Sequence, residues 1–535
     1  MVHVHRAARA LAFAACGLVF AFPGQAQQSH PPAEAFGQLP ALTQPELSPD
    51  GKHLAAVQSH KGRPAAVIYD LDTKPTPAPL VLPYKDGIIE GVNWANNDRL
   101  LITINMNVIG DYDLKVNAWF RTLSVDVHGQ NAVLLFANSA SRNFNYSASG
   151  LVDVDLDDPD HVFMSLWNVD GYFDPTNTIY RIDVNSGNAE VFVRGSSKTS
   201  GWIMDGHGNV VGRVDRDKNP LVDHLLLKHN DDWTEIAKYD ATGARGANLI
   251  GLNTDGTALV QVVAFENSGT DGLAQIALAG GKVTPAFDNP RYDVGGVLID
   301  PWTRRVSGVV YADDKEEYLY FDPKMEALQK GLEVAFPGTS VHAVSWNTAL
   351  DRLVVEVADP RLPVAYYILD RTTHQATSVG RTYPNLTDAD IGEIKPYPYK
   401  ARDGLDIPAY ITLPPGRTPK NLPAVVMPHG GPDFRDGLGF DWWAQFLANR
   451  GYVVLQPNFR GSSGYGDKFT EAGLHQWGLK MQDDITDGVR KMVADGIVDP
   501  KRVCIVGASY GGYVIDSLFD SNLLWYGYLA SGVNS

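Results

Sequence analysis

The stretch Val503-Cys504-Ile505-Val506-Gly507-Ala508-Ser509-Tyr510-Gly511 decides how the C-terminal part of the chain folds. Its first four residues are apolar and predict a buried strand, and the glycines on either side of Ser509 predict a sharp turn into a helix. Such a turn pushes the serine hydroxyl out at the carboxyl end of a sheet, where the first amides of the helix point at it. The pattern therefore predicts a nucleophilic serine rather than a merely structural Gly-Ser turn.

Upstream of this stretch, from about residue 391, strands alternate with helices. Met481, Ile485, Val489 and Val493 recur every four residues and predict one apolar helical face. Alternating strands and helices imply a parallel sheet covered on both faces. The predicted strands are 409–413, 424–427, 452–456 and 503–506, and a further predicted helix is 440–450.

The second motif is His429-Gly430-Gly431-Pro432, which directly follows the predicted strand 424–427. In α/β-hydrolases, a glycine-rich loop after a strand supplies one amide of the oxyanion hole, and the residue after the nucleophile supplies the other. The amides of Gly431 and Tyr510 are therefore predicted to form this hole. A donor of this kind contributes on the order of 3 kcal/mol to the transition state.

From about residue 40 to 390 the chain repeats one kind of unit, a short β-rich run after an Asp, Asn or Gly turn. Examples are Ser48-Pro49-Asp50-Gly51 before 53–57 and Asn253-Thr254-Asp255-Gly256 before 258–263. Such turns between β-branched runs are hairpin signals. The recurring aromatic residue before a turn, as at Trp94 and Trp346, favours radial repeats, and we predict an all-β propeller whose number of blades the pattern leaves open.

Bulk composition excludes several classes of function. A chain of 535 residues is too long for one core and predicts at least two domains. The net charge of -17 opposes binding to nucleic acid. No constellation of His, Cys or carboxylates with metal-ligand spacing occurs, and no cofactor is predicted.

The N-terminus reads as a secretory signal peptide. Its apolar stretch, 11–22, is too short to cross a bilayer, and small residues precede a predicted cleavage after Ala26. Only Cys504 then remains, so no internal disulfide can form. We expect a periplasmic or secreted protein without stable membrane insertion, divided into a signal peptide (1–26), a β-propeller domain (27–390) and an α/β-hydrolase domain (391–535).

The motifs of the C-terminal part together resemble serine peptidases of the prolyl oligopeptidase family, nearest to its acylaminoacyl-peptidase and dipeptidyl-peptidase-like branch. The resemblance implies a seven-bladed propeller that caps the site and admits oligopeptides but not folded proteins. It also implies that Ser509 attacks the peptide carbonyl while Gly431 and Tyr510 hold the oxyanion, and that Arg460 and Asp484 support the loops below. The motifs are Pro428-His429-Gly430-Gly431-Pro432, Asn458-Phe459-Arg460-Gly461-Ser462-Ser463-Gly464-Tyr465-Gly466, Trp477-Gly478, Asp483-Asp484 and Gly507-Ala508-Ser509-Tyr510-Gly511-Gly512-Tyr513.

One departure changes the expectation for this chain. In the family the triad Asp and His follow the nucleophile, whereas here the last histidine is His475, upstream of Ser509. Asp516 and Asp520 follow but lie too close in sequence, on the predicted helix, so the triad Asp and His are absent from this chain. A fragment, a frame disruption or an early stop would each explain this. We expect the 535-residue chain to be inactive, with an incomplete hydrolase domain, because triad losses cost on the order of a million-fold in rate.

Two alternative functions stay open at this point. One is esterase chemistry on the same hydrolase fold, since a fold does not determine the substrate. The other is a non-catalytic propeller binding protein with a hydrolase remnant. The sequence leaves undecided the residue preference at the scissile bond, exo- versus endopeptidase action and the oligomeric state; Glu316-Glu317 is a candidate for gripping an amino terminus by composition only.

Overall fold

The structure is a computed structural model that describes residues 30–520, except 76, 110–115, 140–149, 169–175, 231 and 242–247. The predicted signal peptide (1–26) and residues 521–535 lie outside the described residues. For 107–109, 116–118, 168 and 516–520 only the backbone is described.

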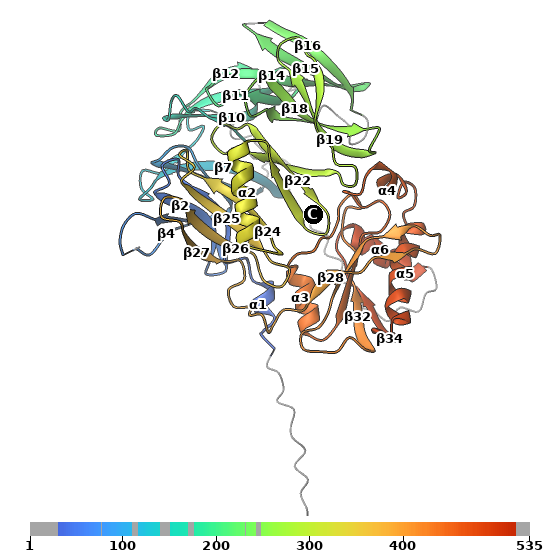
Figure 1. Cartoon of the computed structure of the whole chain (residues 1–535). Helices are drawn as coiled ribbons and strands as arrows, with labels where there is room; N and C mark the ends of the chain where they lie inside the picture. The colour runs from blue at the N-terminus through green and yellow to red at the C-terminus, as the bar shows by residue number, and fades with distance from the viewer. Residues whose placement is uncertain are drawn as a thin grey trace, which may run out of the picture.

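The described residues from 42 to 381 form seven antiparallel sheets arranged as the blades of a β-propeller (Figure 1). Within each blade the strands follow one another in chain order, as hairpin turns require. In the described part of the chain, the sixth blade has three strands and each of the other six blades has four. The strands are β1 (Leu42–Leu47), β2 (His53–His60), β3 (Arg63–Asp70), β4 (Leu80–Pro83); β5 (Ile88–Trp94), β6 (Arg99–Ile109), β7 (Val116–Asp126), β8 (Val133–Leu134); β9 (Leu151–Val154), β10 (His161–Asn168), β11 (Thr176–Asp183), β12 (Ala189–Arg194); β13 (Thr199–Met204), β14 (Val210–Lys218), β15 (Leu221–His229), β16 (Asp232–Asp240); β17 (Leu249–Leu252), β18 (Ala258–Phe265), β19 (Thr270–Ala277), β20 (Val283–Phe287); β21 (Val294–Ile299), β22 (Val306–Ala312), β23 (Glu316–Tyr320); and β24 (Ser340–Trp346), β25 (Arg352–Ala358), β26 (Ala365–Asp370), β27 (Gln375–Arg381).

The repeated turns and tryptophans have the roles that a propeller requires. Gly51 and Gly256 adopt positive φ in the turns between the first two strands of their blades. Trp94 and Trp346 are buried, and each lies at the end of the first strand of its blade. The Trp94 indole donates to the carbonyl of Glu46 in the preceding blade, at 3.0 Å. This tryptophan therefore packs the core and also ties neighbouring blades together.

Helix α2 (Pro323–Ala335) follows the three-stranded sixth blade and packs against β23 and β24. Its start is well defined, because the Asp322 carboxylate accepts hydrogen bonds from two backbone amides and Pro323 occupies the first turn. This helix was not among the elements predicted from the sequence.

The second domain contains a five-stranded sheet in the order β28-β31-β33-β32-β34. Strands β33, β32 and β34 are parallel, as predicted, but β28 and β31 pair antiparallel at one edge. The prediction of a parallel sheet was wrong for this edge, because β28 and β31 are not joined by a helix and short connections suit antiparallel pairs. The elements are β28 (Ile394–Pro396), β29 (Tyr399–Lys400), β30 (Asp406–Ile407), β31 (Ala409–Thr412), β32 (Leu422–Val426), α3 (Trp442–Asn449), β33 (Val453–Pro457), α4 (Asp467–Glu471), α5 (Lys480–Ala494), β34 (Val498–Ile505) and α6 (Tyr510–Asp520).

Apolar side chains cover both faces of this sheet. On one face Val453 and Leu455 pack with Met481 and Ile485 of α5, and on the other Val454 packs with Ala444 of α3. The predicted apolar face of α5 is therefore confirmed. None of the helices in the described ranges has the length and apolar character needed to cross a membrane.

The beginning of the described chain lies against the hydrolase domain. Helix α1 (Glu34–Gly37) places the ring of Phe36 5.8 Å from that of Phe446 in α3, and Figure 1 shows the two helices side by side. The His30 ring nitrogen Nδ1 lies 3.1 Å from the Asn449 side-chain oxygen. Residues 30–37, which were predicted to belong to the propeller domain, therefore pack on the hydrolase domain.

Candidate active site

Ser509 lies between the end of β34 and the start of α6, as the strand-turn-helix pattern predicted. Its side chain is exposed, and its φ of 54° lies in the left-handed region that non-glycine residues rarely adopt. Holding a serine there costs on the order of 1 to 2 kcal/mol. The surrounding packing imposes this conformation, and the hydroxyl faces outward as a result.

The two glycines around Ser509 are required by close backbone contacts. A Cβ on Gly507 would lie 2.7 Å from the carbonyl carbon of Gly511. A Cβ on Gly511 would lie 2.4 Å from the carbonyl oxygen of Pro428, which follows β32. Both distances are far below van der Waals contact, so a side chain at either position would force the surrounding backbone to shift.

The glycine-rich loop after β32 lies beside Ser509. A Cβ on Gly430 would lie 3.5 Å from the Ser509 Cβ and 3.9 Å from its Oγ. Gly431 adopts a φ of 110°. In the described part of the chain, neither the Gly431 amide nor the Tyr510 amide donates to a protein acceptor. The two motifs are therefore brought together, and both amides remain available to a bound group.

His429 supports this loop. Its ring stacks on Phe459 at 4.5 Å, its Nδ1 donates to the Gly430 carbonyl at 2.7 Å, and its Nε2 lies 2.9 Å from the Ser462 hydroxyl. Burial lowers the pKa of His429 to about 4, so the imidazole is neutral at neutral pH. Both ring nitrogens are already engaged within the loop region.

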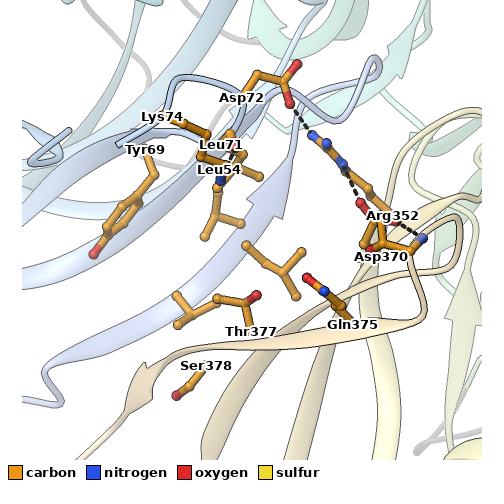
Figure 2. Close-up of a pocket in the computed structure, with 13 residues that line it drawn as sticks. Leu54, Tyr69, Leu71, Asp72, Lys74, Arg352, Asp370, Gln375, Thr377 and Ser378 are labelled. Carbon is orange, nitrogen blue, oxygen red and sulfur yellow. Dashed lines mark hydrogen bonds and ion pairs between the residues drawn. The ribbon is translucent and has the colours of Figure 1, made fainter. Parts of the chain in front are cut away.

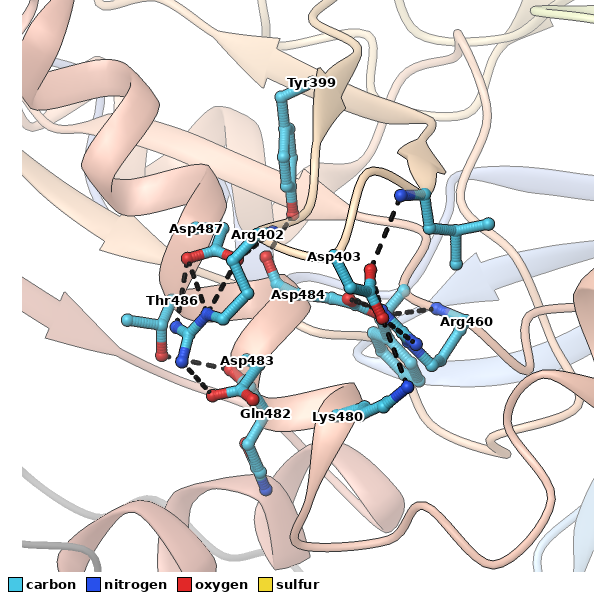
Figure 3. Close-up of polar contacts among 12 residues, drawn as sticks. Tyr399, Arg402, Asp403, Arg460, Lys480, Gln482, Asp483, Asp484, Thr486 and Asp487 are labelled. Carbon is cyan, nitrogen blue, oxygen red and sulfur yellow. Dashed lines mark hydrogen bonds and ion pairs between the residues drawn. The ribbon is translucent and has the colours of Figure 1, made fainter.

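A buried ion pair lies below the loops (Figure 3). The guanidinium of Arg460 donates to both carboxylate oxygens of Asp484 at 2.8 and 2.6 Å, and the Arg460 amide donates to the same carboxylate at 3.0 Å. The other edge of the guanidinium donates to Asp403 at 2.9 and 3.0 Å, and these bonds keep the pKa of Asp403 well below its usual range. The Tyr399 hydroxyl donates to the backbone carbonyl of Asp484 at 2.8 Å. These contacts join the segment after β33 to α5, the supporting position expected for Arg460 and Asp484.

Comparison with known proteins decides the family. Residues 438–531 match the profile of the family described as "Prolyl oligopeptidase family". The hydrolase domain therefore has the sequence signature of this family of serine peptidases. The chain is 29% identical over 526 residues to dipeptidyl aminopeptidase BIII of Pseudoxanthomonas mexicana, which covers 94% of this chain and 73% of that protein. It is 35% identical over 320 residues to dipeptidyl peptidase family member 6 of Caenorhabditis elegans, which covers 56% of this chain and 41% of the relative.

Solved structures of the family share the fold. A puromycin hydrolase superposes with a TM-score of 0.64 at 19% identity, over 93% of this chain and 79% of the other. Pyrococcus horikoshii acylaminoacyl peptidase gives a TM-score of 0.61 at 15% identity, over 93% and 78%. The predicted combination of a β-propeller with an α/β-hydrolase domain is confirmed, and the described strands form seven blades.

The site contains Ser509 but no partner base among the described residues. Within the ranges that the structure covers, the Ser509 hydroxyl makes no hydrogen bond to another residue, and no group of three His, Cys, Asp or Glu side chains is placed to hold a metal ion. The side chains of Asp516 and Asp520 lie outside the described residues. The expected absence of a triad Asp and His therefore stays a prediction from the sequence.

Two further features lie on the propeller. Glu316 accepts a hydrogen bond from the Tyr318 hydroxyl, and Glu317 pairs with Lys315 at 3.6 Å. A cavity of about 580 Å³ lies where the first blade meets the seventh (Figure 2). Its lining includes Leu54, Tyr69, Asp72, Arg352 and Asp370 but not Ser509, so it is separate from the candidate active site.

Proposed function

We propose that Ser509 is the nucleophile of this peptidase and that the Gly431 and Tyr510 amides form its oxyanion hole. The observation that carries the proposal is an exposed serine held at positive φ beside the glycine-rich loop, where a Cβ added to Gly430 would lie 3.9 Å from the Ser509 hydroxyl. A turn with no chemical role would be relieved of this strain by glycine, whereas a reacting hydroxyl needs a serine there.

The reaction that this geometry supports is acyl transfer. The Ser509 oxygen attacks the peptide carbonyl, its proton passes to a base, and the carbonyl oxygen becomes negative opposite the two amides. The C–N bond then breaks, and the amine leaves with a proton. His429 does not fit the base, because both of its nitrogens are engaged with Gly430 and Ser462.

The proposed substrates are oligopeptides, from which the enzyme releases N-terminal dipeptides. This specificity rests on two relatives, which are named as dipeptidyl peptidases. A propeller above the site would admit short peptides and exclude folded proteins. The signal-peptide pattern in residues 1–26 further supports a proposal that the protein acts in the periplasm or outside the cell.

The test is covalent labelling of Ser509 by a fluorophosphonate probe, read by intact mass. It uses the 535-residue chain and a joined chain, in which the segment of dipeptidyl aminopeptidase BIII that follows the position aligned with Asp520 replaces residues 521–535. Each chain has a Ser509→Ala control. We expect labelling of the joined chain that Ser509→Ala abolishes, followed by turnover of dipeptide p-nitroanilides in preference to acyl esters. Labelling that survives Ser509→Ala, or an unreactive joined chain that is folded, would show a different nucleophile or a non-catalytic remnant.

A further inference from the structure

The hairpin between β22 and β23 of the propeller contacts residues 435–438 of the hydrolase domain, which lie just after the glycine-rich loop 429–432 in the sequence. Figure 1 shows β22 directed toward the hydrolase domain. At the hairpin tip, the Arg435 guanidinium donates to the carbonyls of Ala312 at 3.0 Å and Asp313 at 2.7 Å. The Leu438 amide donates to the carbonyl of Asp314 at 2.6 Å. Three successive hairpin carbonyls therefore accept hydrogen bonds from one short segment of the hydrolase domain.

Arg435 is also held from the hydrolase side. Its guanidinium lies over the ring of Tyr465, 4.1 Å from the centroid, where a cation is attracted to the aromatic face. The Tyr465 hydroxyl accepts from the Asn458 side chain at 2.7 Å. A Cβ on Gly464 would lie 2.9 Å from the Arg435 Cδ, so the glycine leaves the space that the arginine stem occupies.

The segment that carries Arg435 begins directly after the glycine loop. The Ser463 amide donates to the Phe434 carbonyl at 3.1 Å. The Asn458 side chain accepts from the Asp436 amide at 2.8 Å and donates to the Asp436 carbonyl at 2.9 Å. The residues on both sides of Arg435 are thus fixed to the segment after β33, and the same short stretch starts with Gly430 beside Ser509.

We propose that Arg435 is a positioning residue through which the sixth blade of the propeller holds the glycine loop at Ser509. Only a planar, multiply donating group can bond two neighbouring carbonyls while stacking on a ring, so lysine is not equivalent here. The propeller then contributes to the construction of the active site in addition to covering it. A role of Arg435 in catalysis rests on the proposed function, whereas its hydrogen bonds between the sixth blade and the hydrolase domain do not.

The test is hydrogen–deuterium exchange of Arg435→Ala, Arg435→Lys and the control Arg502→Ala. Arg502 belongs to the same domain, and its side chain bonds Asn421 and Asp499 of that domain. We expect exchange in peptides covering 429–438 to rise about tenfold in Arg435→Ala, because two charge-assisted hydrogen bonds are lost, and to rise less in Arg435→Lys. Exchange there should not change in Arg502→Ala, and exchange in α5 should not change in any of the variants.

A rise spread evenly over both domains, or unchanged exchange in 429–438, would overturn the proposal. Fluorophosphonate labelling of the joined chain adds the catalytic readout, with an expected reaction about tenfold slower in Arg435→Ala and partial rescue in Arg435→Lys. If Ser509 fails to label in every chain, the proposed function fails, while the exchange result still decides the role of Arg435.

Discussion

Replacing Asp484 with asparagine removes the negative charge from the buried ion pair below the active site. The Arg460 side chain is 5% exposed and that of Asp484 is fully buried, so water cannot replace the lost carboxylate. Breaking a buried pair from one side costs about 3 to 5 kcal/mol. Because Asp403 still accepts two hydrogen bonds from Arg460, we expect Asp484→Asn to lower the free energy of unfolding by about 3 kcal/mol.

The assay is native-state hydrogen exchange in α5 at increasing urea, since a chain of two domains does not unfold in one two-state step. Asp499→Asn is the matched control. It breaks a surface pair with Arg502, whose side chain is 50% exposed, and should leave the exchange in α5 nearly unchanged. The double variant Arg460→Met, Asp484→Leu should be less destabilised than Asp484→Asn, because it leaves no unpaired charge at these two positions. A loss below about 1 kcal/mol in Asp484→Asn would refute this reasoning.

Three further changes test the candidate site. Gly511→Ala should lower the free energy of unfolding by about 1 to 3 kcal/mol, measured by native-state hydrogen exchange in β34. Gly512→Ala, whose Cβ would meet no atom closer than 3.9 Å, should not destabilise, and equal effects would contradict the close approach of Gly511 to Pro428. Ser509→Gly should be about 1 kcal/mol more stable than Ser509→Ala, because glycine tolerates positive φ, and equal stabilities would show that the turn is unstrained. Burial lowers the pKa of His429 from about 6.5 in the unfolded chain to about 4 in the folded chain. As the pH falls between these two values, the unfolded chain binds a proton that the folded chain does not, so the free energy of unfolding decreases. Between pH 7.5 and 5, the free energy of unfolding, measured by native-state hydrogen exchange, should fall by about 2 kcal/mol less in His429→Gln than in the unchanged chain. An equal fall in both proteins would show that another group takes up the proton.

Local patterns predicted the parts of the fold that depend on neighbours in sequence. The four-residue spacing from Met481 to Val493 predicted the buried face of α5, and the glycines at 507 and 511 predicted the turn at Ser509. In these cases the physical requirement is a helical period or a close backbone contact, and the residues that meet it lie near one another in the sequence. Asp322 and Pro323 at the start of α2 are a similar local signal, although this helix was not predicted.

Contacts between distant segments could not be predicted in this way. The antiparallel pairing of β28 and β31 depends on which strands meet, and residue periodicity does not contain that information. Arg435 reads as an ordinary loop arginine until the hairpin at Ala312 is placed beside it. The oxyanion amides were predicted from motif order alone, and their role stays a prediction for the labelling experiment to test.

The docking of α1 on α3 also sets an order of events during protein synthesis. His30 and Asn449 are 419 residues apart, and ribosomes add about 5 to 20 residues per second. The nascent N-terminal segment must therefore wait roughly 20 to 80 s for its binding surface, while the seven blades are made and can fold. During this interval the apolar side chain of Phe36 lacks the aromatic ring of Phe446, which packs against it in the folded protein.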